Sequence, residues 1–264
     1  MLPIYDAIAF VGVVSEGVGH NRPWILLVNT PEGVKQYVVK LFTTQQVQRN
    51  VLTSEVICNV LAREFGLSVP PAALINIPEE LSLTVPPELQ PQFDMADPRP
   101  KFGTEVLVSA PSYIPGLPKT QINKRISLDT LYAFDNLIKN ADRGQFKTNL
   151  LMTPDLAYLI DHEFALQEAD IQLPKQGLHQ IDDKFLRQHI FYPLLRKGSR
   201  QTKSEYFGEF FECLRLLNIH NLTPYFQQLI HIGCCSNQQE ITRWLNEMKR
   251  NSVTFVNQLR GSLQ

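Results

Sequence analysis

The chain has 264 residues and 44% of them are hydrophobic, which is enough to form one large core or two smaller ones. Its 25 basic and 26 acidic side chains nearly cancel, which argues against a protein that binds nucleic acid or an acidic membrane surface through overall positive charge. Four cysteines lack the spacing of a disulfide framework or a zinc site, and neither a basic leader nor an apolar run of membrane-spanning length is present. We therefore expect a globular cytoplasmic protein with no nucleic-acid partner and no membrane span.

The first part of the chain is predicted to consist mainly of strands. Residues 5–14 and 23–29 are rich in β-branched and apolar side chains, and a turn separates them. This turn contains Gly17 and Gly19, whose backbone N–H groups could approach phosphate groups, although a plain hairpin turn is the alternative. A third strand is predicted over residues 35–42 from its alternating pattern.

A lysine on the third strand and a glutamate on the next helix form a candidate pair. Lys40 lies in the sequence VVKLF, and apolar residues at helical spacing predict a helix over residues 52–65 with Thr53 or Ser54 as its N-cap. A helix placed behind the strand would let Glu55 pair with Lys40. The alternatives are a solvated strand lysine and a first-turn glutamate favoured by the helix dipole.

The region between this helix and the middle of the chain contains two further predicted strands. Gly66 and the prolines after it end the helix, and residues 72–77 form the next strand. Residues 78–101 are rich in proline and lack a periodic pattern, so we expect an irregular insertion. Residues 102–110 return as a strand, and residues 111–126, which contain several prolines and a glycine, are predicted to be a loop.

Residues 134–166 contain most of the chemical information. A helix capped by Ser127 leads to Asp142 in a glycine-containing turn, and Asn149 leads into a short apolar strand. A second strand, residues 156–160, leads to Asp161. Because a hairpin fixes the register of the loops around it, these three polar side chains can come together.

These residue types suit phosphoryl transfer. One carboxylate can orient or deprotonate an attacking hydroxyl, while an asparagine and a second carboxylate can hold Mg²⁺. Each residue taken alone is more commonly a turn residue or a helix cap. Beyond about residue 180 the chain is predicted to be helical, and Trp244 and its apolar neighbours are interpreted as core.

Two stretches resemble a known family. The pattern N-x-D-R, then N-L-L, then L-I-D-H-x-x-A within residues 134–166 is similar to the catalytic core of HipA-like kinases, and more distantly to that of phosphoinositide and type II phosphatidylinositol 4-kinases. The pattern E-x-x-x-x-x-L-A-x-x-x-G-L-x-V-P-x-A, which begins at Glu55, also resembles HipA-like kinases. The resemblance covers residues 5–166 loosely and residues 134–166 well.

The resemblance implies an α+β fold of the bilobal protein-kinase-like type. An antiparallel β-rich N-lobe would span residues 1–108, and a mostly helical C-lobe would span residues 109–264. The C-lobe would contain a catalytic hairpin at 140–163 and a helical part at 180–264.

The resemblance also implies transfer of a phosphoryl group from ATP, with Mg²⁺, to a hydroxyl. The HipA-like resemblance suggests serine or threonine of a protein as the acceptor and the more distant one suggests a lipid, and the nearly neutral charge favours a protein. Lys40 would hold the nucleotide phosphates and Glu55 would fix Lys40, while Asp142 would orient the acceptor and Asn149 with Asp161 would hold the metal ion.

Further roles follow for neighbouring residues. The backbone at Glu105 or Leu107 would recognise adenine, with a simple edge strand as the alternative. Arg143 is expected to tie the loop together, Lys147 to neutralise the transferred phosphate, and His162 to be a packed histidine.

One departure from the kinase pattern keeps alternatives open. Asp142 and Asn149 are seven positions apart in this chain, whereas the usual kinase loop separates its pair by about five. The longer loop admits an inactive pseudokinase that only binds ATP, and a nucleotidyl transferase on the same fold would transfer AMP instead. A metallohydrolase that uses Asp142, Asp161 and His162 would leave Lys40 and Glu55 without a role.

Overall fold

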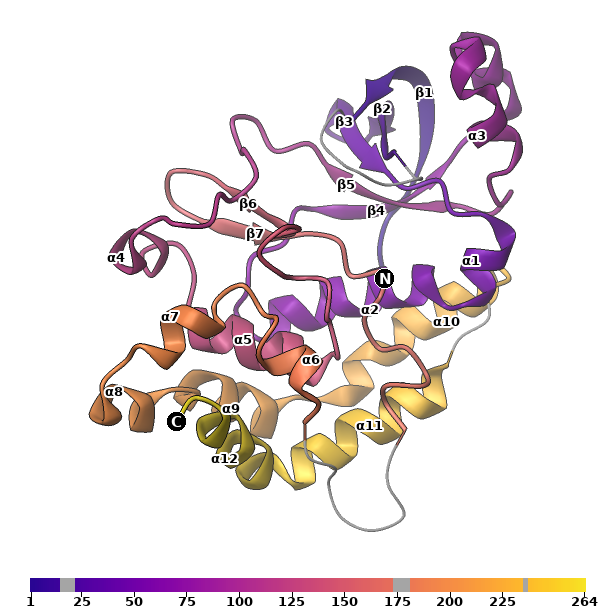
Figure 1. Cartoon of the computed structure of the whole chain (residues 1–264). Coiled ribbons are helices and arrows are strands. Elements are labelled where there is room, and N and C mark those ends of the chain that lie inside the picture. The colour runs from indigo at the N-terminus through magenta and orange to yellow at the C-terminus, as the bar shows by residue number, and fades with distance from the viewer. Residues whose placement is uncertain (15–21, 173–180, 235–236) are drawn as a thin grey trace. The chain divides into compact units, whose positions relative to one another are not determined.

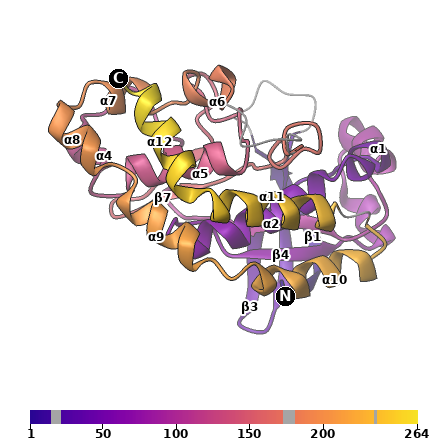
Figure 2. The same ribbon diagram turned by 90° about the horizontal axis from the view of Figure 1, so that it is seen from below.

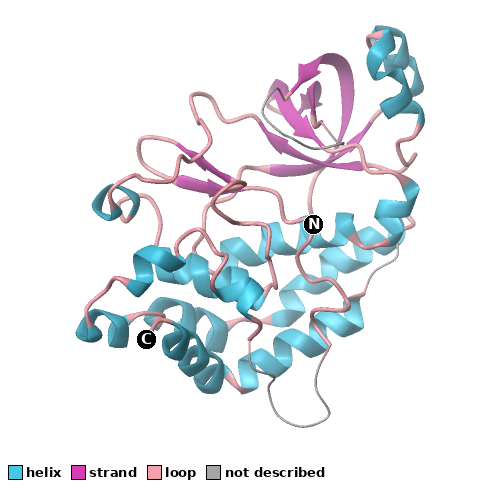
Figure 3. Ribbon diagram, viewed as in Figure 1, coloured by secondary structure: helices cyan, strands magenta, loops and turns pink. Residues whose placement is uncertain are grey.

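The computed structural model describes residues 1–14, 22–172, 181–234 and 237–264. Gly17 and Gly19, the glycines predicted to approach phosphate, lie outside the described residues. The fold is α+β, with a strand-rich N-terminal region and a helical C-terminal part, as the sequence predicts (Figures 1 and 3). The chain divides into two compact units, neither of which is one continuous segment. Unit 1 comprises residues 1–56, 70–108 and 224–236, and unit 2 comprises residues 57–69, 109–223 and 237–264.

Unit 1 is built around a closed five-stranded barrel in the order β1-β2-β3-β5-β4. Its strands are β1 (Ile4–Val13), β2 (Trp24–Thr30), β3 (Gly33–Val39), β4 (Ala72–Asn76) and β5 (Lys101–Glu105). Alternate residues of β2 point into the barrel, where Trp24, Leu26 and Val28 are completely buried. The apolar residues that alternate along this strand in the sequence therefore line the interior of the barrel.

The prediction of an entirely antiparallel sheet is wrong at one pairing, because β1 and β4 run parallel and close the barrel. Neighbouring strands joined by a hairpin must be antiparallel, but two strands and two helices lie between β1 and β4 in the chain, so these two strands can pair in parallel. The strand predicted over 102–110 is also shorter, since β5 ends at Glu105.

One short helix, the first residues of a longer helix that continues in unit 2, and a short helical insertion complete most of unit 1. Helix α1 (Thr44–Gln48) begins with a capping box made by Thr43 and Gln46, and α2 (Val51–Glu64) follows. The prediction that Thr53 or Ser54 caps α2 is wrong, because the helix begins two residues earlier and both side chains are buried within it.

The predicted irregular insertion contains short helical turns that pack on the barrel. They are η1 (Glu79–Thr84), η2 (Pro87–Leu89) and α3 (Gln90–Asp94). Trp24 of the barrel donates from Nε1 to Gln92 Oε1 at 3.0 Å and stacks on Phe93. Helix α10 (Thr223–His231) also belongs mostly to unit 1, where Gln228 bonds both backbone groups of Leu2.

Unit 2 is a helical assembly with one short hairpin. Its elements are α4 (Lys119–Ile122), α5 (Leu128–Leu137), β6 (Leu150–Met152), β7 (Ala157–Leu159), α6 (Asp183–Leu186), α7 (Tyr192–Arg196), α8 (Arg200–Glu205), α9 (Gly208–Leu216), η3 (Ile219–Leu222), α11 (Gln238–Arg250) and α12 (Ser252–Ser262). Helix α9 contacts α5, α11 and α12, and the lower view shows these helices together (Figure 2). Nearly every residue of α5 is buried, so this helix is the centre of the unit.

Two predictions in unit 2 need correction. Ser127 stands at the N-cap position of α5, but its hydroxyl donates to the side chains of Asp129 and Thr130 instead of capping a backbone N–H. The loop predicted over 111–126 contains the single helical turn α4, which follows Pro118. None of the described helices is long and apolar enough to cross a membrane.

Candidate active site

The predicted ion pair between Lys40 and Glu55 is present in unit 1. Lys40 directly follows β3, and its Nζ donates to Oε1 of Glu55 on α2. The Glu55 side chain is almost completely buried, whereas the Lys40 side chain keeps 18% of its surface exposed. A buried carboxylate requires a charged or hydrogen-bonded partner. The pair therefore fixes the orientation of the Lys40 ammonium while part of that side chain stays accessible to a ligand.

The end of β5 leaves a backbone carbonyl without its usual partner. The Val106 N–H donates to Gln36 O of β3 at 2.9 Å, whereas the Glu105 N–H donates to Pro71 O on the opposite side at 2.8 Å. In an antiparallel ladder the Glu105 carbonyl would accept from the N–H of residue 71. Pro71 has no N–H, so this carbonyl lacks that donor.

The side chain of Glu105 has a partner, whereas its backbone carbonyl lacks one on the β4 side. Lys35 Nζ donates to Oε2 of Glu105 at 3.2 Å, so the carboxylate is already paired on the barrel surface. Two residues further on, the N–H of Leu107 has no hydrogen-bond acceptor among the residues that the structure describes. An available carbonyl at Glu105 and an available N–H at Leu107 thus form an acceptor and donor pair on one backbone segment.

The loop that precedes the hairpin of unit 2 brings Asp142 and Asn149 into direct contact. Asn149 Nδ2 donates to the Asp142 carboxylate at 3.2 Å and to the Asp142 carbonyl at 3.1 Å. The Asp142 N–H in turn donates to Asn140 Oδ1 at 3.1 Å. The extra length of the loop is therefore accommodated as a bulge, and it does not separate the two predicted residues.

Asp161 joins this pair through the hairpin. The Ile160 N–H donates to the Asn149 carbonyl at 3.1 Å, which ties the end of β7 to the start of β6. Lys147 Nζ lies 2.5 Å from Asp142 Oδ2 and 2.9 Å from Asp161 Oδ2. The three polar residues predicted on either side of the hairpin thus converge in one cluster.

The backbone at this cluster has an uncommon conformation. Asn149 and Asp161 have positive φ angles of 48° and 61°. Asparagine and aspartate tolerate this left-handed region better than other residues with a side chain, and such positions are concentrated at functional sites. The conformation turns both side chains toward the cluster at a modest energetic cost.

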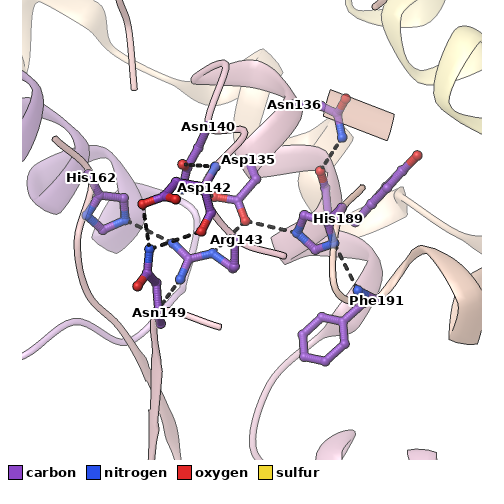
Figure 4. A network of polar contacts seen from close by, with 10 residues as sticks. Asp135, Asn136, Asn140, Asp142, Arg143, Asn149, His162, His189 and Phe191 are labelled. Carbon is purple, nitrogen blue, oxygen red and sulfur yellow. Dashed lines mark hydrogen bonds and ion pairs between the residues drawn. The ribbon is translucent and has the colours of Figure 1, made fainter. Parts of the chain in front are cut away.

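A second, fully buried cluster lies next to the first (Figure 4). Asp135 of α5 accepts from Arg143 Nε at 2.6 Å, from His189 Nε2 at 2.9 Å and from Asn140 Nδ2 at 3.1 Å. Arg143 also donates to the Asn149 carbonyl. Arg143 therefore ties the loop to the helix core, as predicted, and it fixes the backbone that carries Asn149.

Charge and tautomer are well defined in this buried cluster. Burial alone would raise the pKa of Asp135, but Arg143 and His189 reverse this effect and lower it to about 2. His189 Nδ1 accepts from the Phe191 N–H at 3.1 Å, so the proton of the neutral ring is on Nε2, which donates to Asp135. Burial lowers the pKa of His189 below its ordinary value of 6.5, so the ring is neutral at pH 7.

His162 is a packed histidine, as predicted. Its side chain is buried, and its Nε2 accepts from Arg143 at 3.4 Å because a guanidinium group only donates. A metal ion could not use the same nitrogen while this bond exists. The contact therefore weighs against a metallohydrolase that uses His162 as a ligand.

The sequence reasoning missed Asp135 and His189. Asp135 had a visible signal, because it is a charged residue within the otherwise apolar stretch L-Y-A-F-D-N-L-I. A charge at such a position is buried and needs partners. His189 lies 54 positions away from Asp135 and gave no comparable signal.

Asn149 and Asp161 carry ligand atoms of the type that suits Mg²⁺. Mg²⁺ prefers oxygen ligands, which the Asn149 amide and the Asp161 carboxylate supply. The ammonium group of Lys147 already lies against Asp161, so the cluster accommodates positive charge at this place.

Comparison with known protein families gives a match over most of the chain. A family model described as HipA-like kinase matches residues 17–218, a range that includes every candidate residue described above. No curated protein matches the chain.

Proposed function

The chain belongs to the HipA-like kinase family, and from this premise we propose that it transfers the γ-phosphoryl group of ATP to a hydroxyl, with serine or threonine of a protein as the acceptor. The observation that carries the proposal is the convergence of Asp142, Asn149 and Asp161 in one cluster of unit 2. This set combines a carboxylate for the acceptor with two oxygen ligands for a metal ion, which is what phosphoryl transfer requires.

Each residue of the catalytic loop has a distinct role in this proposal. Asp142 accepts a hydrogen bond from the acceptor hydroxyl and takes its proton as the new bond forms. The Asn149 amide oxygen and the Asp161 carboxylate hold Mg²⁺, which supplies positive charge to the phosphate oxygens when it is bound. Arg143 holds the loop in place through its hydrogen bonds to Asp135 of α5 and to the Asn149 carbonyl.

The groups of unit 1 bind the nucleotide. Lys40, oriented by Glu55, binds phosphate oxygens through its ammonium group. The Glu105 carbonyl accepts from the amino group of adenine, and the Leu107 N–H donates to a ring nitrogen. Two such backbone bonds match the donor and acceptor edge of adenine without using a side chain. A protein-kinase-like fold is part of the same proposal.

The experiment is phosphate transfer by the full chain with ATP and Mg²⁺, measured as ATP consumption and as the mass added to the protein or to a general protein substrate. Lys40→Met, Asp142→Ala and Asp161→Asn are expected to reduce the rate by about a hundredfold or more each. Lys184→Met is the matched control, because Lys184 forms a 2.6 Å ion pair with Asp170 away from the cluster. Its rate should equal that of the parent.

Three outcomes overturn the proposal. Equal ATP consumption by the parent and by the Asp142→Ala and Asp161→Asn variants would show that the proposed site does not produce the activity. Thermal stabilisation by ATP without any turnover would identify a pseudokinase. Addition of AMP instead of phosphate would identify a nucleotidyl transferase.

A further inference from the structure

The loop between Asp142 and Asn149 sends two neighbouring side chains in opposite directions. The pair is seven positions apart, about two more than in the usual kinase loop. Phe146 is fully exposed, whereas the next residue, Lys147, turns back to the acidic cluster. The additional length therefore places a cation from the loop itself against the two catalytic acids.

The ammonium group of Lys147 bridges both acids. Its Nζ lies 2.5 Å from Asp142 Oδ2 and 2.9 Å from Asp161 Oδ2, and it also lies over the ring of Phe164. Two carboxylates that both lie within 3 Å of one ammonium group repel each other when no cation lies between them. Lys147 relieves that repulsion in the nucleotide-free protein.

The attachment of Lys147 differs from that of a structural lysine. Half of its side-chain surface is exposed, and it extends from a surface loop on a flexible stem. Such a side chain can leave its partners at little cost when a stronger cation arrives. One of its partners is Asp161, which is also the carboxylate suited to a metal ion.

We propose that Lys147 is the resident counter-ion of the catalytic loop, which neutralises Asp142 and Asp161 in the nucleotide-free protein and competes with a divalent cation for Asp161. This inference rests on the proposed function, because Asp161 matters as a metal ligand only in a phosphotransferase. The protein alone then binds a divalent cation weakly. ATP relieves the competition, because its phosphates offer negative charge to both the metal ion and Lys147.

The test is Mn²⁺ binding to the full chain without nucleotide, followed by electron paramagnetic resonance of the free ion. Lys147→Met, which keeps an unbranched, flexible side chain and removes its charge, should bind Mn²⁺ about tenfold more tightly than the parent. Lys147→Arg, which keeps the charge, and Phe146→Ala, which changes the adjacent exposed residue, should bind like the parent. Adding Asp161→Asn to Lys147→Met should remove the gain.

A purely structural role for Lys147 predicts no gain in Mn²⁺ affinity when its charge is removed. If Lys147→Met binds Mn²⁺ no more tightly than the parent while its melting temperature shows a folded protein, the inference is wrong. The gain must also disappear in the double variant, since a gain that persists would place the metal elsewhere. The phosphate-transfer experiment described above measures turnover separately. An active parent whose Lys147→Met variant has unchanged Mn²⁺ affinity refutes this inference alone, and an inactive parent whose variant has increased affinity refutes the proposed function alone.

Discussion

Two clusters of acids and bases meet at one peptide bond, and they differ in exposure. In the buried cluster the side chains of Asp135, Arg143 and His189 are 0%, 0% and 1% exposed. In the exposed cluster the side chains of Asp142, Lys147 and Asp161 are 26%, 50% and 15% exposed. Asp142 and Arg143 are adjacent in sequence, yet each belongs to a different cluster. Both clusters pair carboxylates with basic side chains, so the depth of burial is what distinguishes them.

The physical reason is solvation. A buried ion pair loses its water, so removing one partner leaves an uncompensated charge in the core. An exposed pair keeps much of its hydration, so its contribution to folding is small and its members are free to bind a ligand. The comparison predicts that variants of the buried cluster mainly lose stability, while variants of the exposed cluster mainly lose activity.

The largest expected effect is on folding. Arg143→Met leaves Asp135 buried without its guanidinium partner, and the free energy of unfolding should fall by about 3–5 kcal/mol. Urea denaturation followed by circular dichroism measures the change. Arg215→Met is the control, because Arg215 forms an exposed ion pair with Glu212 and its loss should change stability by less than about 1 kcal/mol. Equal midpoints for the two variants would contradict the comparison.

The second effect is on catalysis. Asp142→Asn keeps the shape of the side chain but removes the proton acceptor, so the rate of phosphate transfer should fall about a thousandfold. The unfolding free energy should change by less than about 1 kcal/mol, because the pair with Lys147 is exposed. Asp170→Asn is closely matched, since Asp170 has similar exposure and a lysine partner at 2.6 Å. The Asp170→Asn variant should keep the parent rate. If Asp142→Asn lowered the free energy of unfolding as much as Arg143→Met does, the distinction between the clusters would be lost.

The smallest effect is a pH dependence of stability that originates in the buried cluster. The pKa of His189 is lowered from 6.5 by burial, so the unfolded chain takes up a proton before the folded protein does. Above pH 6.5 the ring is neutral in both states, so His189 does not make stability depend on pH there. The free energy of unfolding falls as the pH drops from 6.5 toward the lowered pKa of the folded protein. Asp135 has a pKa of about 2, so this carboxylate keeps its charge throughout the window.

Urea midpoints of the parent and of His189→Gln at pH 5, 6, 7 and 8 measure this difference. The parent should lose more stability than the variant between pH 6.5 and pH 5. Parallel profiles would show that His189 is not the titrating group.

Local pattern was sufficient for much of the architecture. The alternating residues of β2, the helical spacing of α2 and the glycine that ends it reflect interactions between residues a few positions apart. The Lys40–Glu55 pair was also predictable, because a strand and the helix that follows it are adjacent in the chain. The errors in helix capping at Thr53, Ser54 and Ser127 arose because several residues near a helix start can cap it, and tertiary packing selects among them.

By itself the sequence determined the order of the elements and the polar residue types around the hairpin of β6 and β7, because side-chain periodicity and turn residues act locally. Only the tertiary structure decided which charges are buried with which partners. It closed the barrel with a parallel pairing, left the Glu105 carbonyl opposite a proline, and joined Asp135 to His189 across 54 positions. Such contacts depend on the packing of distant segments, and the desolvation that gives each charge its role arises only when those segments have come together.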